Sequence, residues 1–303
     1  MSPLGELVRS RRVVSLVGLS KNAGKTTALN HLLRQYREWE PPVAVTSIGR
    51  DGEETDLVTA TPKPRVYVHS GCFFATAEGL LRLCDAACEI LAVTDFPTAL
   101  GRVVVARARS GGFAQLGGPS ISGHLAAVAE IMKGCGASKV LVDGAISRKS
   151  ASAPSISDGV VLCAGASLSS SMREVAAAAA HWAKMLALPV FCAESGGPPL
   201  EVPGAATDSK IRGLLFSGEG LEGRTVLFDE PGKILFGPDT YAKLAKRGAA
   251  LAVRRRAELL AVTVNPVSSR GFSFPRDEFM RAVAEAVCAP VFDLGAGFAE
   301  TAG

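Results

Sequence analysis

The sequence is poor in the patterns that mark zinc enzymes and nucleophilic hydrolases. Its four histidines, His31, His69, His124 and His181, have neither metal-ligand nor catalytic-triad spacing. Neither a GxSxG nor an HExxH pattern occurs anywhere in the chain. The sequence therefore gives no support to a serine hydrolase or a zinc hydrolase.

Cysteine is used in a way that argues against a disulfide scaffold. The seven cysteines include no CxxC pair, and an odd number is a poor disulfide framework. Cys84 and Cys88 lie four residues apart on a predicted helix, so they could bind a metal or be thiols of the core. No histidine or further cysteine pair accompanies them, which favours core thiols. We expect reduced thiols, as in a cytoplasmic protein.

Long apolar runs and a strong charge imbalance are also missing. No uninterrupted apolar stretch reaches the roughly 18 residues that a membrane span needs. The short apolar run near the N-terminus leads into a Gly/Lys-rich segment rather than a cleavage site. With 33 Lys and Arg against 29 Asp and Glu, the charge balance is ordinary. We expect a cytoplasmic protein with no membrane partner and no direct nucleic-acid partner.

What the chain does have is an alternation of apolar strand patterns and helical patterns. Residues 13–18 (VVSLVG) predict a buried strand, and the following segment carries Leu29, Leu32 and Leu33 at helical spacing. Another apolar run follows at residues 42–49. A strand, helix, strand order predicts an α/β fold with a mainly parallel sheet.

Later segments repeat this alternation with one interruption. Residues 62–118 contain short strands around a Gly-Gly turn, and we expect them to add antiparallel edge strands. Helix and strand patterns then return until a Pro/Gly-rich segment at 196–204. We take this segment as a domain boundary, which predicts a first domain at 1–198 and a smaller α/β unit or extension at 199–303.

The first predicted strand runs into GLSKNAGKTT, from Gly18 to Thr27, and a helix follows. Backbone N–H groups at such a strand-to-helix turn, together with the helix dipole, hold polyphosphate. Lys25 is expected to reach the β- and γ-phosphates of a nucleoside triphosphate, and the Thr26 hydroxyl to ligate magnesium. The predicted nucleotide contacts are Gly18, Ser20, Lys21, Asn22, Ala23, Gly24, Lys25, Thr26 and Thr27.

This loop departs from the common pattern GxxxxGK[ST]. That pattern requires glycine at position 19, where this chain has Leu19, with glycine one place earlier at Gly18. Lys21 is either a second cation on the phosphates or a solvated loop lysine, and it lies one position away from the signature of loops that use such a lysine. The first domain is thus predicted to be a variant P-loop nucleotide-binding domain.

Three further residues are candidates for catalysis. Asp143 ends a hydrophobic strand, where a magnesium-orienting carboxylate is expected, although it could instead be a turn residue before Gly144. Arg148 could stabilise the charge that develops during phosphoryl transfer, or be a surface arginine. Asp51 could orient water or magnesium, or belong to a solvated acidic loop.

The base of the nucleotide is indicated only indirectly. Guanine is read in many such folds by an NKxD segment, and neither Asn30 nor Asn265 lies in that pattern. The sequence therefore favours ATP, with Mg²⁺, over GTP.

Five segments carry a resemblance to a known family: GLSKNAGKTT, TSIGRDGEETD, AQLGGPSIS, VDGAISRKS and VTVNP. Together they resemble the P-loop ATPase subunit of lysine 5,6-aminomutase reactivases. The resemblance implies an ATP-driven chaperone that works with a MutS-like subunit to expel damaged cobalamin from an aminomutase. It also implies that Gly24, Lys25 and Thr26 are nucleotide ligands.

Wider relatives leave other functions and assemblies open. The loop and Asp143 also resemble SIMIBI-like P-loop NTPases such as dethiobiotin synthetase-like and MinD-like proteins, which are often homodimers with nucleotide at the interface. Leu19 and the shifted Lys21 depart from that dimer pattern. A small-molecule kinase or ligase and a non-catalytic nucleotide sensor are the alternative functions.

Overall fold

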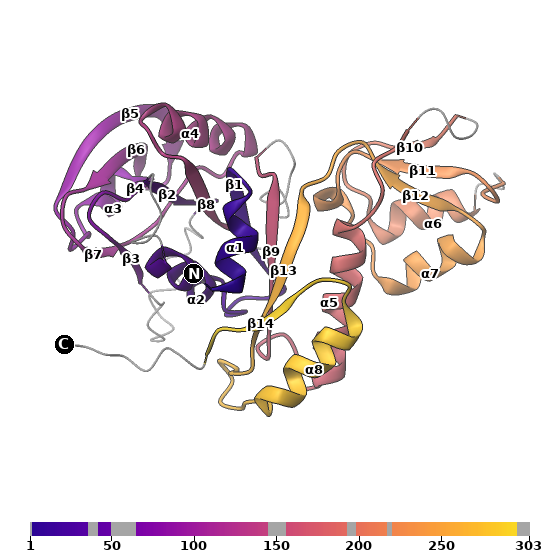
Figure 1. The fold of residues 1–303 in the computed structure, drawn as a ribbon. Coiled ribbons are helices and arrows are strands. Elements are labelled where there is room, and N and C mark those ends of the chain that lie inside the picture. The colour runs from indigo at the N-terminus through magenta and orange to yellow at the C-terminus, as the bar shows by residue number, and fades with distance from the viewer. Residues whose placement is uncertain are drawn as a thin grey trace.

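The computed structural model describes residues 2–35, 42–49, 65–144, 156–192, 198–216 and 220–295, which form two α/β units (Figure 1). The larger unit is built on a nine-stranded sheet. In spatial order its strands are β14 (Val291–Asp293), β13 (Glu258–Asn265), β9 (Gly159–Gly165), β1 (Val13–Gly18), β8 (Lys139–Gly144), β2 (Val43–Ser47), β4 (Phe73–Ala77), β6 (Gly101–Ala108) and β5 (Cys88–Thr98).

Strand pairing in this sheet follows the predicted pattern. All pairs from β14 through to β4 are parallel, whereas β6 pairs antiparallel with both β4 and β5. Every residue of β1, β2 and β9 is buried, as expected for parallel strands that are covered on both faces. The α/β class, the mainly parallel sheet and the antiparallel edge strands are confirmed.

Helices cover the sheet on both faces. Helices α1 (Pro3–Arg9) and α2 (Lys25–Gln35) share a core with Val14 and Leu16 of β1. On the opposite face, α4 (Ser122–Gly134) packs against the alternate β1 residues. The same face is completed around β9 and β13 by α5 (Met172–Leu186) and α8 (Arg276–Ala286). This three-layer arrangement leaves the ends of the strands open for loops.

Smaller elements complete the edge of this unit. The short helix α3 (Glu78–Leu81) follows β4, and β3 (Val66–Val68) pairs antiparallel with β7 (Gly112–Ala114). Cys84 and Cys88 are partly buried and pack against the main core there. Their burial agrees with the interpretation as core thiols, but the predicted helix through them is wrong, because Cys84 follows α3 and Cys88 is the first residue of β5.

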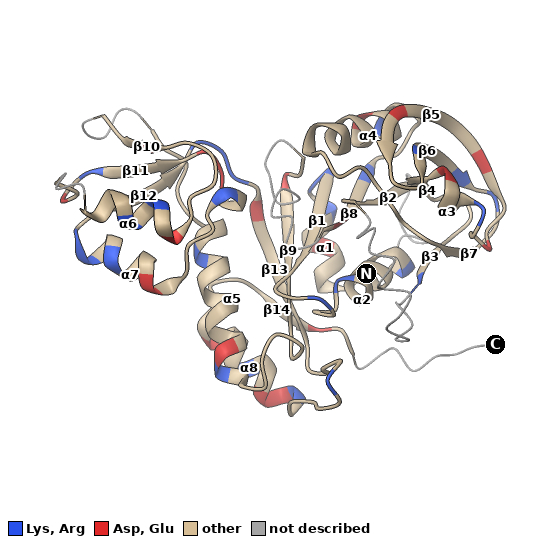
Figure 2. Ribbon diagram, turned by 180° about the vertical axis from the view of Figure 1, so that it is seen from behind, with Lys and Arg blue, Asp and Glu red and all other residues tan. Residues whose placement is uncertain are grey.

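The second unit has its own three-stranded parallel sheet and its own core. It contains β10 (Leu200–Val202), α6 (Asp208–Phe216), β11 (Thr225–Phe228), the 3-10 helix η4 (Pro231–Lys233), α7 (Pro238–Lys246) and β12 (Ala250–Val253). Lys and Arg, as well as Asp and Glu, are scattered over both units (Figure 2).

This second unit is an insertion rather than a C-terminal domain. After β12 the chain returns to the large sheet as β13, α8 and β14, which corrects the prediction that 199–303 forms one smaller unit. The two connections run side by side, since Phe191 N–H donates to Val253 O at 2.9 Å and Val253 N–H to Pro189 O at 3.0 Å. A strand pattern does not specify which sheet the strand joins, so the sequence of β13 could not reveal this return.

Helix α5 is shared by the two units. Its fully buried Met185 belongs to the core of the insertion, and His181 Nε2 lies 3.0 Å from Phe236 O. The Lys184 ammonium lies 4.4 Å from the centre of the Tyr241 ring, within the range of a cation–π contact. None of the helices in the described ranges is long and apolar enough to cross a membrane.

Lys139 holds the amino-terminal helix to the sheet. Its buried Nζ donates to Val8 O at 2.8 Å, to Arg9 O at 3.1 Å and to Arg11 O, so it satisfies carbonyls at the end of α1. Burial lowers the pKa of this ammonium to about 8, although Asp158 opposes the shift.

We expect Lys139→Met to abolish the contribution of this group to the pH dependence of stability, because methionine keeps the aliphatic stem but has no group that titrates. The unfolded chain binds more protons than the folded one between pH 8 and 10.5, so this group makes wild-type stability rise with pH in that window. Denaturant unfolding should show the rise in wild type and lose it in the variant. An equal pH dependence of both proteins contradicts the assignment.

Candidate phosphate-binding site

The loop between β1 and α2 lies at the centre of the large sheet. β1 lies between β8 and β9. After β1 the chain turns to one face of the sheet, and after β9 it turns to the opposite face. In open α/β sheets, ligands bind outside the carboxyl ends of the strands at such a switch point. This position makes the loop a candidate ligand-binding site.

The backbone of the loop is shaped by two left-handed residues. Asn22 has φ 58° and Gly24 has φ 94°, values that asparagine and glycine tolerate better than other residues. The first helical hydrogen bond of α2 runs from Ala28 N–H to Gly24 O at 2.9 Å. The amides of Lys25, Thr26 and Thr27 precede that bond and have no acceptor within the helix. Amides of this kind, together with the helix dipole, are suited to hold an anion.

Lys25 folds back over the end of β1. A Cβ atom built on Gly18 would lie 3.0 Å from the Lys25 Nζ and 3.0 Å from its Cγ. A side chain at position 18 would therefore push the ammonium away from the loop. This close approach is the physical reason for glycine at this position, and it brings the cation to the mouth of the loop.

Leu19 takes part in the core instead of the loop opening. It is buried, its N–H donates to Cys163 O at 2.8 Å, and it packs in one cluster with Val175 and Ala179 of α5. Leu19, which stands where the common pattern has glycine, thus anchors the start of the loop to β9 and α5.

The carboxyl end of β9 also touches the loop. A Cβ atom on Gly165 would lie 2.6 Å from the Cα atom of Ala23, so only glycine allows the two backbones this close. The loop is therefore packed against its neighbouring strand on the β9 side. Ser20 and Lys21 lie farther out, where the Ser20 hydroxyl donates to Lys21 O at 3.0 Å and Lys21 is exposed.

Asp143 lies on the other neighbour of β1. In the parallel ladder it pairs with Leu16 of β1 and with Ser47 of β2. It is partly buried and belongs to β8 itself, which extends to Gly144. The strand position agrees with a carboxylate that faces the loop from the adjacent strand.

The charges of Lys25 and Asp143 both act on the thiol of Cys163. Burial raises the pKa of the Cys163 thiol to about 11; the Lys25 ammonium opposes this rise and the Asp143 carboxylate adds to it. Cys163 pairs with Gly18 at the end of β1. A cation and a carboxylate thus both lie close to the carboxyl end of the central strand.

The AQLGGPSIS segment reaches the same edge of the sheet. Gly118 N–H donates to Ser47 Oγ at 3.2 Å, and Gly49 N–H donates to Pro119 O at 2.9 Å. This segment therefore crosses the end of β2, next to the strand that carries Asp143. Two other predicted site residues, Asp51 and Arg148, lie outside the described residues.

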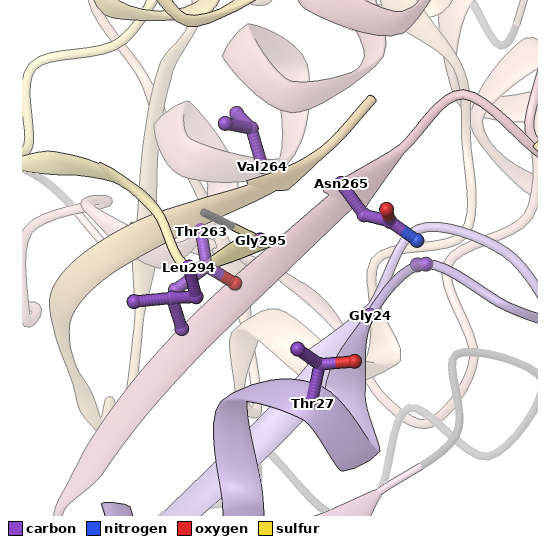
Figure 3. Close-up of a pocket in the computed structure, with 8 residues that line it drawn as sticks. Gly24, Thr27, Thr263, Val264, Asn265, Leu294 and Gly295 are labelled. Atoms are coloured by element: carbon purple, nitrogen blue, oxygen red, sulfur yellow. The ribbon is translucent and has the colours of Figure 1, made fainter. Parts of the chain in front are cut away.

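Asn265 is a site residue that the sequence pattern did not identify. It ends β13, and its Nδ2 donates to Asn22 O at 3.2 Å. Beside it is a small pocket (Figure 3), which is lined by Ala23, Gly24, Thr27, Thr263, Val264, Asn265, Leu294 and Gly295. The available signal was an asparagine at the end of an apolar strand pattern, in VTVNP.

Comparison of the chain with family models, curated proteins and solved structures gave no match. The chemistry of the site therefore has to be argued from its geometry.

Proposed function

We propose that the protein is a P-loop NTPase that binds and hydrolyses ATP at Gly18–Thr27. The observation that carries the proposal is the folding of Lys25 over Gly18, at the start of α2 and next to the strand that carries Asp143. A cation, free helix amides and a nearby carboxylate are the groups that hold a triphosphate and its metal.

The residues at the loop fit a magnesium ion. Mg²⁺ prefers hard oxygen ligands, and the Thr26 hydroxyl in the first turn of α2 and the Asp143 carboxylate supply oxygens. Magnesium, when bound, neutralises charge on the phosphates. Lys25 would attract the β- and γ-phosphates, while the amides of the first turn orient them.

Two residues complete the proposed hydrolysis. In the sequence, Asp51 follows β2 and Arg148 follows β8. We propose Asp51 for orienting water and Arg148 for stabilising the charge of the transferring phosphoryl group.

The client in this proposal is a cobalamin-dependent aminomutase, with a MutS-like protein as the second subunit. It is supported by the five motifs that resemble the reactivase family and by an insertion that shares α5 with the nucleotide-binding unit. A module that shares a helix with the loop's own core is suited to transmit the nucleotide state to a partner.

The partner proposal is tested by affinity capture of the native protein, with and without Mg-ATP. We expect a MutS-like protein and an aminomutase to be recovered, in amounts that change with nucleotide. Recovery of neither protein in both conditions contradicts the reactivase function. Phosphate release that requires a metabolite instead would favour a small-molecule kinase or ligase, and binding with no release would favour a nucleotide sensor.

A further inference from the structure

Asn265, partly buried at the end of β13, makes three hydrogen bonds to other segments of the chain. Its Nδ2 donates to Asn22 O at 3.2 Å, and its Oδ1 accepts from Val267 N–H at 3.2 Å. Its backbone carbonyl accepts from Ala166 N–H at 2.9 Å. One residue thus joins the phosphate-binding loop to the segments that follow β9 and β13.

Asn265 contacts the loop at Asn22, whose backbone is in the left-handed conformation. Asn22 is the one non-glycine residue with positive φ in the described part of the chain. Asparagine tolerates this conformation better than most residues, but glycine adopts it at lower cost, so Asn22 gains from support by its surroundings. The Asn265 amide binds the carbonyl of this residue and so fixes the peptide that leads to Ala23.

Asn265 also limits the loop sterically. A Cβ atom on Gly24 would lie 3.0 Å from the Asn265 Cβ, so the two residues lie close together and both line the same pocket (Figure 3). The stem of Asn265 therefore packs against the last residue before α2, while its amide holds the residue two places earlier. Both contacts restrict the backbone whose amides face the phosphates.

We propose that Asn265 is a positioning residue that holds the loop in its anion-binding conformation. This inference rests on the proposed function of the loop. It adds that the loop is supported by a residue of β13, which lies 243 positions after Asn22 in the sequence. The support acts on the phosphate end of the ligand. Loss of the Asn265 side chain should therefore lower the affinity for every triphosphate by the same factor, whatever its base.

The test is calorimetric titration of wild type and Asn265→Ala with Mg-ATP, Mg-GTP and inorganic tripolyphosphate. We expect the variant to bind all three about 10-fold more weakly, which is the effect of one or two lost hydrogen bonds. A loss confined to one nucleotide, with tripolyphosphate unchanged, overturns the inference and makes Asn265 a contact to the base. Equal binding by both proteins also overturns it.

A second variant separates positioning from general destabilisation. Glycine adopts positive φ without cost, so Asn22→Gly makes the supported conformation intrinsic to the loop. In that background Asn265→Ala should lose much less affinity, about 3-fold or less. A full 10-fold loss in both backgrounds contradicts positioning through Asn22.

Asn30 provides a matched control, because it lies in α2, the helix that follows the loop. Its Nδ2 donates to Arg65 O at 2.9 Å and its Oδ1 accepts from Tyr67 N–H at 3.1 Å, the same pair of side-chain bonds that Asn265 makes. Asn30→Ala should leave all three affinities unchanged. If the wild-type protein binds none of the three ligands, the proposed function is contradicted. If it binds them and Asn265→Ala does not change the affinities, only this inference is contradicted.

Discussion

Replacing Lys25 with alanine should lower the affinity for Mg-ATP by about 100-fold, because a charge-assisted contact to phosphate is lost at a partly buried site. The fold should survive, since the Lys25 side chain lies over the loop rather than in the core. Calorimetric titration measures the affinity, and thermal unfolding shows whether the midpoint stays near that of wild type.

Lys133→Ala is the matched control for this experiment. Lys133 lies in the last turn of α4 and pairs with Glu130 at 2.5 Å, so its loss removes one lysine without touching the loop. An exposed pair of this kind contributes little to stability. Nucleotide affinity should be unchanged in this control, and a weakening as large as that of Lys25→Ala would point to overall charge instead of the site.

Gly118→Ala should lower the free energy of unfolding by about 3 kcal/mol, the upper end of the cost of overpacking a core. Gly118 is buried, and a Cβ atom there would overlap the carbonyl oxygen of Ser47, which is backbone and cannot rotate away. Either β2 or the AQLGGPSIS segment must shift. Because Ser47 pairs with Asp143, nucleotide affinity should fall together with stability.

A glycine-to-alanine substitution in a helix should change the free energy of unfolding in the opposite direction. Gly123 lies in α4 and has no heavy atom within 4 Å of a built Cβ, so alanine only improves helix propensity there. Gly123→Ala should raise the free energy of unfolding by about 0.5 to 1 kcal/mol. Denaturant unfolding of both variants measures the contrast, and an unchanged stability of Gly118→Ala would show that the close approach to Ser47 does not exist in solution.

Local patterns predicted most of the fold. The apolar runs of β1 and β9 and the helical spacing of Leu29, Leu32 and Leu33 in α2 indicated a parallel sheet, because strands buried on both faces need continuous apolar sequence. The return of β13 to the large sheet was not predictable in this way. Its sequence specifies a strand, but its partner β9 is chosen by packing between segments far apart in the chain.

The site was predictable to the extent that it is local. The loop and its lysine lie in one short motif, and the position of Asp143 follows from its place at the end of an apolar strand pattern. The role of Gly18 and the burial of Leu19 depend on where Lys25 and α5 lie in space. Asn265 was missed for the same reason, since its contact to Asn22 joins residues that no local pattern connects.

The most direct test of the central claim is a calorimetric titration of the wild-type protein with Mg-ATP, repeated in the presence of inorganic tripolyphosphate. The proposed function predicts saturable binding that tripolyphosphate competes away, because the loop amides and Lys25 would hold the phosphates. Absence of Mg-ATP binding, or binding that tripolyphosphate does not displace, would contradict a phosphate-binding function for Gly18–Thr27.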